Sequence, residues 1–88
     1  MKKAIPTRGS TRIDVRYDAV LVTSDGDEVG VVVIDLSADG FRIEIDDEVR
    51  VGEQVILRTR RDGDVPAQIV WTLGSQAGGS FLAKPVIA

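Results

Sequence analysis

The chain has 88 residues, a formal net charge of −3, and no cysteine or histidine. This length supports one domain with a single compact core, and the lack of cysteine excludes disulfides and thiolate metal sites. The lack of histidine removes the commonest general base and the commonest zinc ligand. We therefore expect a binding protein and not an enzyme, with no metal and no cofactor.

Charge is distributed unevenly along the chain. Residues 1–12 carry four basic side chains and no acid, residues 13–48 carry eleven acids against two arginines, and residues 49–88 carry a small basic excess. The acidic middle argues against a DNA- or RNA-binding protein, which needs a broad basic face. A basic segment beside an acidic body is either a solvated tail or a device that folds over an anionic ligand.

Residues 1–12 mix proline, glycine, serine and basic side chains without periodicity, which predicts a flexible arm that stays poorly ordered unless something holds it. No apolar run approaches the length of a membrane span, and no secretory signal follows Met1. We expect a cytoplasmic protein without membrane insertion, consisting of this arm and a folded domain over residues 13–88.

The folded domain has the pattern of an all-β protein. Short apolar or alternating segments are separated by turn residues, and no long window has the 3.6-residue period of a helix. The predicted strands cover residues 13–22, 28–36, 41–45, 54–60, 65–73 and 80–87. Residues 74–79 are predicted to be a loose loop, and Trp71 a residue of the barrel wall. Because closure removes exposed sheet edges, six such strands favour a six-stranded antiparallel β-barrel.

The second predicted strand ends in two polar residues, Asp35 and Ser37. Residues at i and i+2 of an extended chain point to the same side, so we expect both side chains to face one surface. Gly40 then supplies backbone freedom for a change of direction. This pattern is either an ordinary turn or a binding edge, in which Asp35 accepts hydrogen bonds from N1–H and N2–H₂ of a guanine and Ser37 adds a short contact.

The arm holds the other candidate pair, Arg8 and Arg12. Spacing of four residues has no fixed meaning in a loop, and the chain contains eight arginines, so such a pair arises easily by chance. The functional interpretation depends on the guanidinium group, a planar fork that pairs with guanine or phosphate. Two of these groups on an arm are able to clamp a flat anionic ligand.

Taken together, these features resemble the PilZ domain family. The family motif R-x-x-x-R matches Arg8 to Arg12 immediately before the first strand, and D/N-x-S-x-x-G matches Asp35 to Gly40 at the end of the second. Three shorter family features follow in order: Gly30-Val31, Val70-Trp71 and Gly79-Ser80-Phe81. The resemblance covers roughly residues 8–86.

The resemblance implies a bacterial receptor for the second messenger cyclic di-GMP. It implies that Arg8 and Arg12 contact guanine and phosphate from the arm, that Asp35 and Ser37 read a guanine edge, and that Gly40 permits the turn. The arm would become ordered over the ligand and present a new surface to a downstream protein partner. The alternative is a PilZ-fold protein-interaction module that binds no nucleotide.

One position departs from the family pattern. Thr7 stands where many PilZ domains have a basic residue directly before the first motif arginine. In the family, that position influences whether one ligand or an intercalated pair of ligands is bound, so the resemblance leaves both stoichiometries open.

Overall fold

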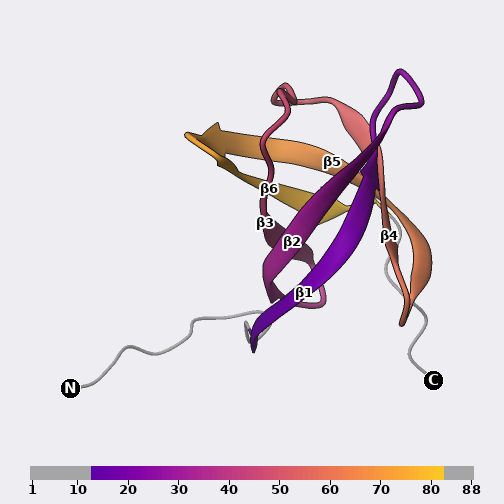
Figure 1. Cartoon of the computed structure of the whole chain (residues 1–88), viewed down its shortest axis with the longest axis vertical. Coiled ribbons are helices and arrows are strands. Elements are labelled where there is room, and N and C mark those ends of the chain that lie inside the picture. The colour runs from indigo at the N-terminus through magenta and orange to yellow at the C-terminus, as the bar shows by residue number, and fades with distance from the viewer. Residues whose placement is uncertain (1–12, 83–88) are drawn as a thin grey trace.

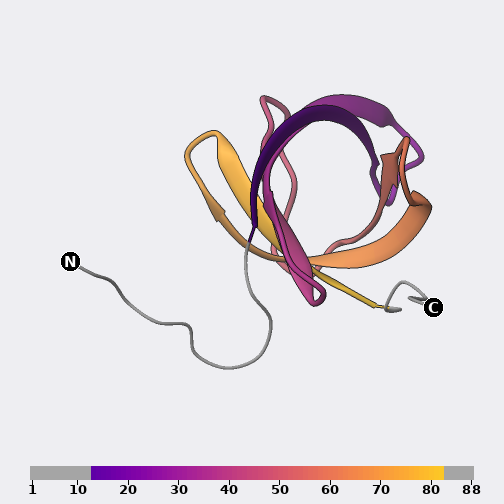
Figure 2. The ribbon, with the colours of Figure 1, turned by 90° about the horizontal axis from the view of Figure 1, so that it is seen from below.

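The structure of the protein, a computed structural model, describes residues 13–82, so the predicted arm lies outside the described residues. Six strands follow one another in the order β1 (Ile13–Val22), β2 (Glu28–Leu36), β3 (Gly40–Glu44), β4 (Gln54–Thr59), β5 (Gly63–Leu73) and β6 (Gln76–Phe81). They form a closed barrel in the order β1-β2-β3-β6-β5-β4, with every pairing antiparallel (Figures 1 and 2). The predicted fold class is confirmed. None of the segments from residue 13 to residue 82 is a helix able to cross a bilayer.

The barrel interior is filled by the apolar side chains of alternating strand residues. The largest fully buried side chains are Phe41, Leu21, Ile43, Leu57, Ile69 and Val33. Burying each of these side chains contributes about 1.5–3 kcal/mol to folding. Each of the strands β1 to β5 contributes at least one of these six side chains. One shared core therefore holds the barrel together, and not separate pairs of neighbouring strands.

Closure is uneven around the barrel. β1 meets β4 only through Val20, Leu21 and Val22, which lie opposite Arg58, Leu57 and Ile56. β1 pairs with β2 from one end to the other, with Ile13 opposite Leu36 and Val22 opposite Glu28. The start of β1 therefore lies directly beside the end of β2, which is where the candidate binding motif begins.

The predicted boundaries of β1 and β2 are correct, and those of the next three strands are wrong by one or two residues. β3 begins and ends one residue earlier than predicted, and β4 ends at Thr59. β5 begins at Gly63, whose φ of +71° lets the chain leave the preceding turn already paired with Thr59. Strand propensity alone does not predict this pairing, because it assigns a glycine that follows a turn to the turn itself.

The prediction for the sixth strand and the loop before it is wrong. β6 covers residues 76–81, and only Gly74 and Ser75 form the turn from β5, with φ of +59° at Gly74. Residues 83–87 of the predicted strand lie outside the described residues. The β5–β6 hairpin extends beyond the ring of the other strands in both views (Figures 1 and 2).

Two glycines that suggested a loop are required by packing inside β6. A Cβ at Gly79 would lie 2.5 Å from Cζ of Phe41 and 2.9 Å from the carbonyl oxygen of Gln68, and a Cβ at Gly78 would overlap the indole of Trp71. The half-exposed Trp71 thus lies against β6 as part of the barrel wall, as predicted. Glycine here serves close packing and not chain flexibility.

At the end of the barrel away from Asp35, Glu53 joins two connections. Its carboxylate accepts hydrogen bonds from the backbone N–H of Ser24 (3.1 Å), the hydroxyl of Ser24 (2.8 Å) and the backbone N–H of Arg50 (3.0 Å). Partial burial by itself would raise the pKa of Glu53, but these hydrogen bonds and the charge of Arg50 outweigh burial and lower the pKa. The ionised carboxylate therefore stabilises the folded chain.

We predict that Glu53→Gln removes the part of the free energy of unfolding that wild type loses when Glu53 is protonated in acid. Because the pKa of Glu53 is lowered on folding, its contribution is present above its ordinary value of 4.5 and is lost as the pH falls through the folded value. Urea unfolding should show the variant less stable than wild type at neutral pH, with a smaller difference at about pH 3. A difference that stays constant with pH would contradict this role.

We predict that Gly79→Ala destabilises the barrel by about 1–3 kcal/mol, the usual cost of overpacking a filled core. Gly30→Ala is the matched control, because a Cβ at Gly30 meets nothing within 4 Å and the residue also lies in a strand. Urea unfolding of both variants measures the two costs. Equal destabilisation would show that the packing against Phe41 does not require glycine.

Candidate functional site

The motif residues Asp35, Ser37 and Gly40 lie together at the junction of β2 and β3. Asp35 is the penultimate residue of β2, Ser37 starts the connection, and Gly40 is the first residue of β3. Since β1 starts beside the end of β2, with Asp14 opposite Asp35, this junction and the start of the barrel are at the same end. The structure therefore brings together three of the five predicted site residues, and Arg8 and Arg12 lie outside the described residues.

Asp35 is nearly buried and is paired with an arginine that the sequence analysis missed. Its exposed fraction is 3%, and Oδ2 lies 2.8 Å from Nη2 of Arg42. The two residues are directly opposite each other in the β2–β3 ladder. A buried carboxylate needs such a partner, because an unpaired charge out of water is strongly unfavourable.

A β-bulge in β2 sets which residue of β3 lies opposite Asp35. Val33 pairs with Ile43, but the next pair is Asp35 with Arg42, so Ile34 is an extra residue in β2. After the bulge, Leu36 lies opposite the buried Phe41 and packs against the core. Burial in β2 still alternates through Val31, Val33 and Asp35, so the bulge changes which residue of β3 lies opposite Asp35 and not the side that Asp35 faces.

Ser37 is engaged within the turn that follows β2. Its Oγ accepts hydrogen bonds from the backbone N–H of Gly40 (3.2 Å) and of Asp39 (3.3 Å), and its own N–H donates to the carbonyl oxygen of Gly40 (2.9 Å). A hydroxyl that satisfies backbone groups in this way fixes a turn. Ser37 thus holds the shape of the motif, whatever further contact it makes to a ligand.

Gly40 is needed for a different reason from the predicted one. Its φ is not positive, so the turn does not require the special backbone freedom of glycine. A Cβ at Gly40 would instead overlap the carbonyl group of Gly79 in the neighbouring strand β6. The backbone N–H of Phe81 also donates to the carbonyl oxygen of Asp39 (2.8 Å), so Gly40 allows β6 to approach and hold the turn.

Two buried donors near this end have no hydrogen-bond partner within the described part of the chain. They are Nε of Arg42 and the hydroxyl of Tyr17. Burial raises the pKa of the Tyr17 phenol, the charge of Asp62 adds to this effect, and that of Arg61 opposes it. An unsatisfied buried donor costs about 1–3 kcal/mol, and such groups are candidates for a role in binding.

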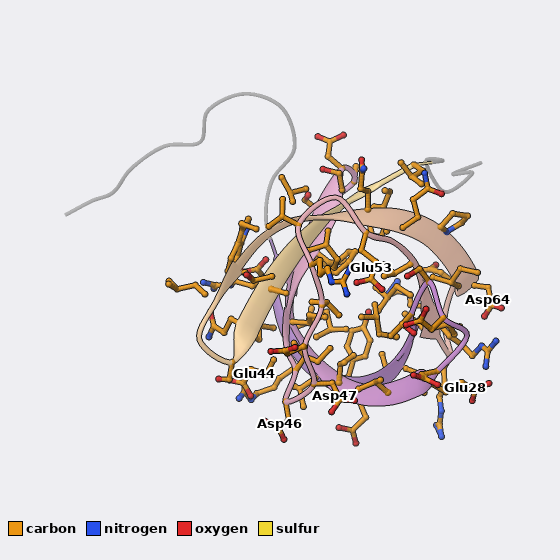
Figure 3. All side chains as sticks on the ribbon, turned by 90° about the horizontal axis from the view of Figure 1, so that it is seen from above. Glu28, Glu44, Asp46, Asp47, Glu53 and Asp64 are labelled. Carbon is orange, nitrogen blue, oxygen red and sulfur yellow. The ribbon has the colours of Figure 1, made fainter. Side chains whose placement is uncertain are left out.

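The opposite end of the barrel is acidic. A cleft of about 740 Å³ there is bounded by the β1–β2 turn and the β3–β4 connection, and its acidic lining residues are Asp25, Asp27, Asp46, Asp47, Glu48 and Glu53. Figure 3 looks onto this end and shows Asp46, Asp47 and Glu53 around it. One basic side chain, that of Arg50, is also in the lining. This charge repels an anionic ligand, so the cleft is unsuitable for one.

We predict that Ser37→Ala destabilises the protein by about 1 kcal/mol, because two backbone N–H groups of the turn lose their acceptor. Ser80→Ala is the control, since Ser80 is an exposed strand residue. Chemical unfolding measures both variants. No difference between them would mean that the Ser37 hydroxyl does not support the turn.

Comparison with known proteins gives the family. The sequence matches the PilZ domain over residues 6–84, which includes both arginines of the arm and the whole of the described barrel. A search of the curated proteins gave no match to this chain. PilZ domains form a family of non-catalytic binding domains that bind cyclic di-GMP. With its closed six-stranded barrel and with both motifs inside the matched range, the chain belongs to the PilZ domain family.

Proposed function

We propose that this protein is a cyclic di-GMP receptor whose ligand binds at the β2–β3 junction. Asp35 would accept hydrogen bonds from a guanine, the turn fixed by Ser37 and Gly40 would hold the adjoining surface, and Arg8 and Arg12 would close over the ligand from the arm. The main support is the Asp35 carboxylate, which is nearly buried and fixed by an ion pair of 2.8 Å at the family's guanine-reading position.

The chemistry of Asp35 suits a guanine. An ionised carboxylate only accepts hydrogen bonds, and the guanine edge offers N1–H and N2–H₂ side by side. Hydrogen bonds to a charged acceptor in a site of low dielectric are stronger than those in water. Because Asp35 is only 3% exposed, ligand binding has to be accompanied by local rearrangement, which suits a receptor that changes state.

Chain connectivity favours the arm as the second half of the site. Ile13 lies opposite Leu36 at the end of β2, and consecutive Cα atoms are about 3.8 Å apart. The chain segment that carries Arg8 and Arg12 therefore joins the barrel beside this junction, and five residues of chain separate Arg8 from Ile13, a reach of at most about 19 Å. The acidic cleft lies at the opposite end of the barrel, beside the β1–β2 turn.

The proposed signal is a change in the arm and not a chemical reaction. Ordering each arm residue costs about 1–2 kcal/mol, so the ligand's contacts have to offset this cost before the arm becomes fixed. The ligand thereby favours one arrangement of the arm over others. The ordered arm and the adjoining barrel would then form a surface for a downstream protein.

We predict that the protein binds cyclic di-GMP and that Arg12→Ala weakens binding at least about tenfold, since a bidentate arginine–guanine contact is worth about 1–3 kcal/mol. Arg50→Ala is the control, because Arg50 lines the acidic cleft at the other end. Calorimetric titration measures all three proteins. Absence of heat with wild-type protein at tens of micromolar would instead favour the interaction module that binds no nucleotide.

A further inference from the structure

We infer that Arg42 is a specificity-determining residue of this site, which reads the O6 atom of the guanine beside Asp35. This inference rests on the proposed function and adds a residue to it. Three observations support it: Arg42 lies opposite Asp35 in the β2–β3 pairing, it forms an ion pair with Asp35, and its buried Nε–H takes no part in that ion pair.

The geometry of the guanidinium group places the unused donor next to the carboxylate. Nε and Nη2 of an arginine lie along one edge of a rigid planar fork. Nη2 of Arg42 lies 2.8 Å from Oδ2 of Asp35, while Nε is buried and has no partner among the described residues. The free N–H is therefore beside the Asp35 carboxylate.

This arrangement is complementary to guanine and not to adenine. The pairing edge of guanine presents N2–H₂, N1–H and the acceptor O6 in a row. A carboxylate with an N–H donor beside it presents the opposite sequence of acceptors and donor. Adenine has an amino group in place of O6 and an acceptor at N1. The N–H donor of Arg42 would then face the amino donor, and the carboxylate of Asp35 would face the N1 acceptor.

The β-bulge is what makes the pair possible. Continuing the register of Val33 with Ile43 would place Ile34 opposite Arg42, whereas the bulge brings Asp35 to that position. Bulges often re-aim a side chain beside a functional site. The Arg42 side chain is 40% exposed and that of Asp35 is 4% exposed, so Arg42 extends from the buried carboxylate to the surface from which a ligand arrives.

The test compares three cyclic dinucleotides that differ only in their bases: guanine, hypoxanthine (which keeps N1–H and O6 but lacks the N2 amino group) and adenine. Each is titrated against wild type, Arg42→Met, Arg42→Lys and Arg16→Met. Arg16 is the matched control, because its ion pair with Glu44 (3.2 Å) also joins two strands, on a side chain that is 61% exposed. Chemical unfolding of every variant reports whether it is folded.

We expect Arg42→Met to bind the guanine and hypoxanthine ligands about tenfold more weakly, with no loss for the adenine ligand, so that the guanine-to-adenine preference falls about tenfold. Arg42→Lys should also show a smaller preference for the guanine ligand over the adenine ligand. It keeps the positive charge beside Asp35 and with it the fold, but a single ammonium cannot reproduce the fixed fork. Arg16→Met should bind like wild type.

An unchanged preference in either Arg42 variant would overturn the inference, and so would an equal loss for all three ligands, which indicates a purely structural role. The proposed function would survive both results. If the wild type binds no cyclic di-GMP, the proposed function fails and this inference fails with it. If Arg42→Met does not fold, Arg42→Lys decides.

Discussion

The barrel depends on the close approach of β3 to β6, two strands that are far apart in the sequence. Gly40 and Gly79 make this contact possible, because a Cβ at Gly40 would overlap the backbone of Gly79 and a Cβ at Gly79 would overlap the ring of Phe41. Without the β3–β6 pairing the six strands would form an open sheet with two exposed edges. The same approach brings Phe81 against Asp39 and so holds the turn of the binding motif.

Fold and candidate site are therefore built from the same contacts. Gly40 belongs to the family motif, yet its visible role is to let β6 approach, and the visible role of Ser37 is to satisfy backbone groups of the turn. Of the described motif residues, Asp35 is the one whose chemistry points to a ligand. A motif conserved for its shape and one conserved for ligand contact look alike in a sequence, and the two roles separate only when the neighbours are known.

The acidic side chains of the described barrel are concentrated at one end. Carboxylates gather at the end formed by the β1–β2 turn and the β3–β4 connection, where Glu53 uses its charge to join the two segments. At the other end, the buried carboxylate of Asp35 is paired with Arg42. The basic segment of the sequence joins the barrel at this second end, because β1 begins there with Ile13 opposite Leu36.

The sequence by itself determined the fold class, the extents of β1 and β2, the position of the motif at the end of β2 and the family. These follow from local chemistry: alternation of apolar residues, turn residues such as Asp25-Gly26, and two short motifs in order. Only the tertiary structure decided that residues 76–79 are a strand, that Leu36 packs against the core from a partly buried position, and that Arg42 holds Asp35. Each of these depends on contacts between strands, namely the packing of Phe41 and Trp71 on glycines and the bulge that shifts the β2–β3 register by one residue.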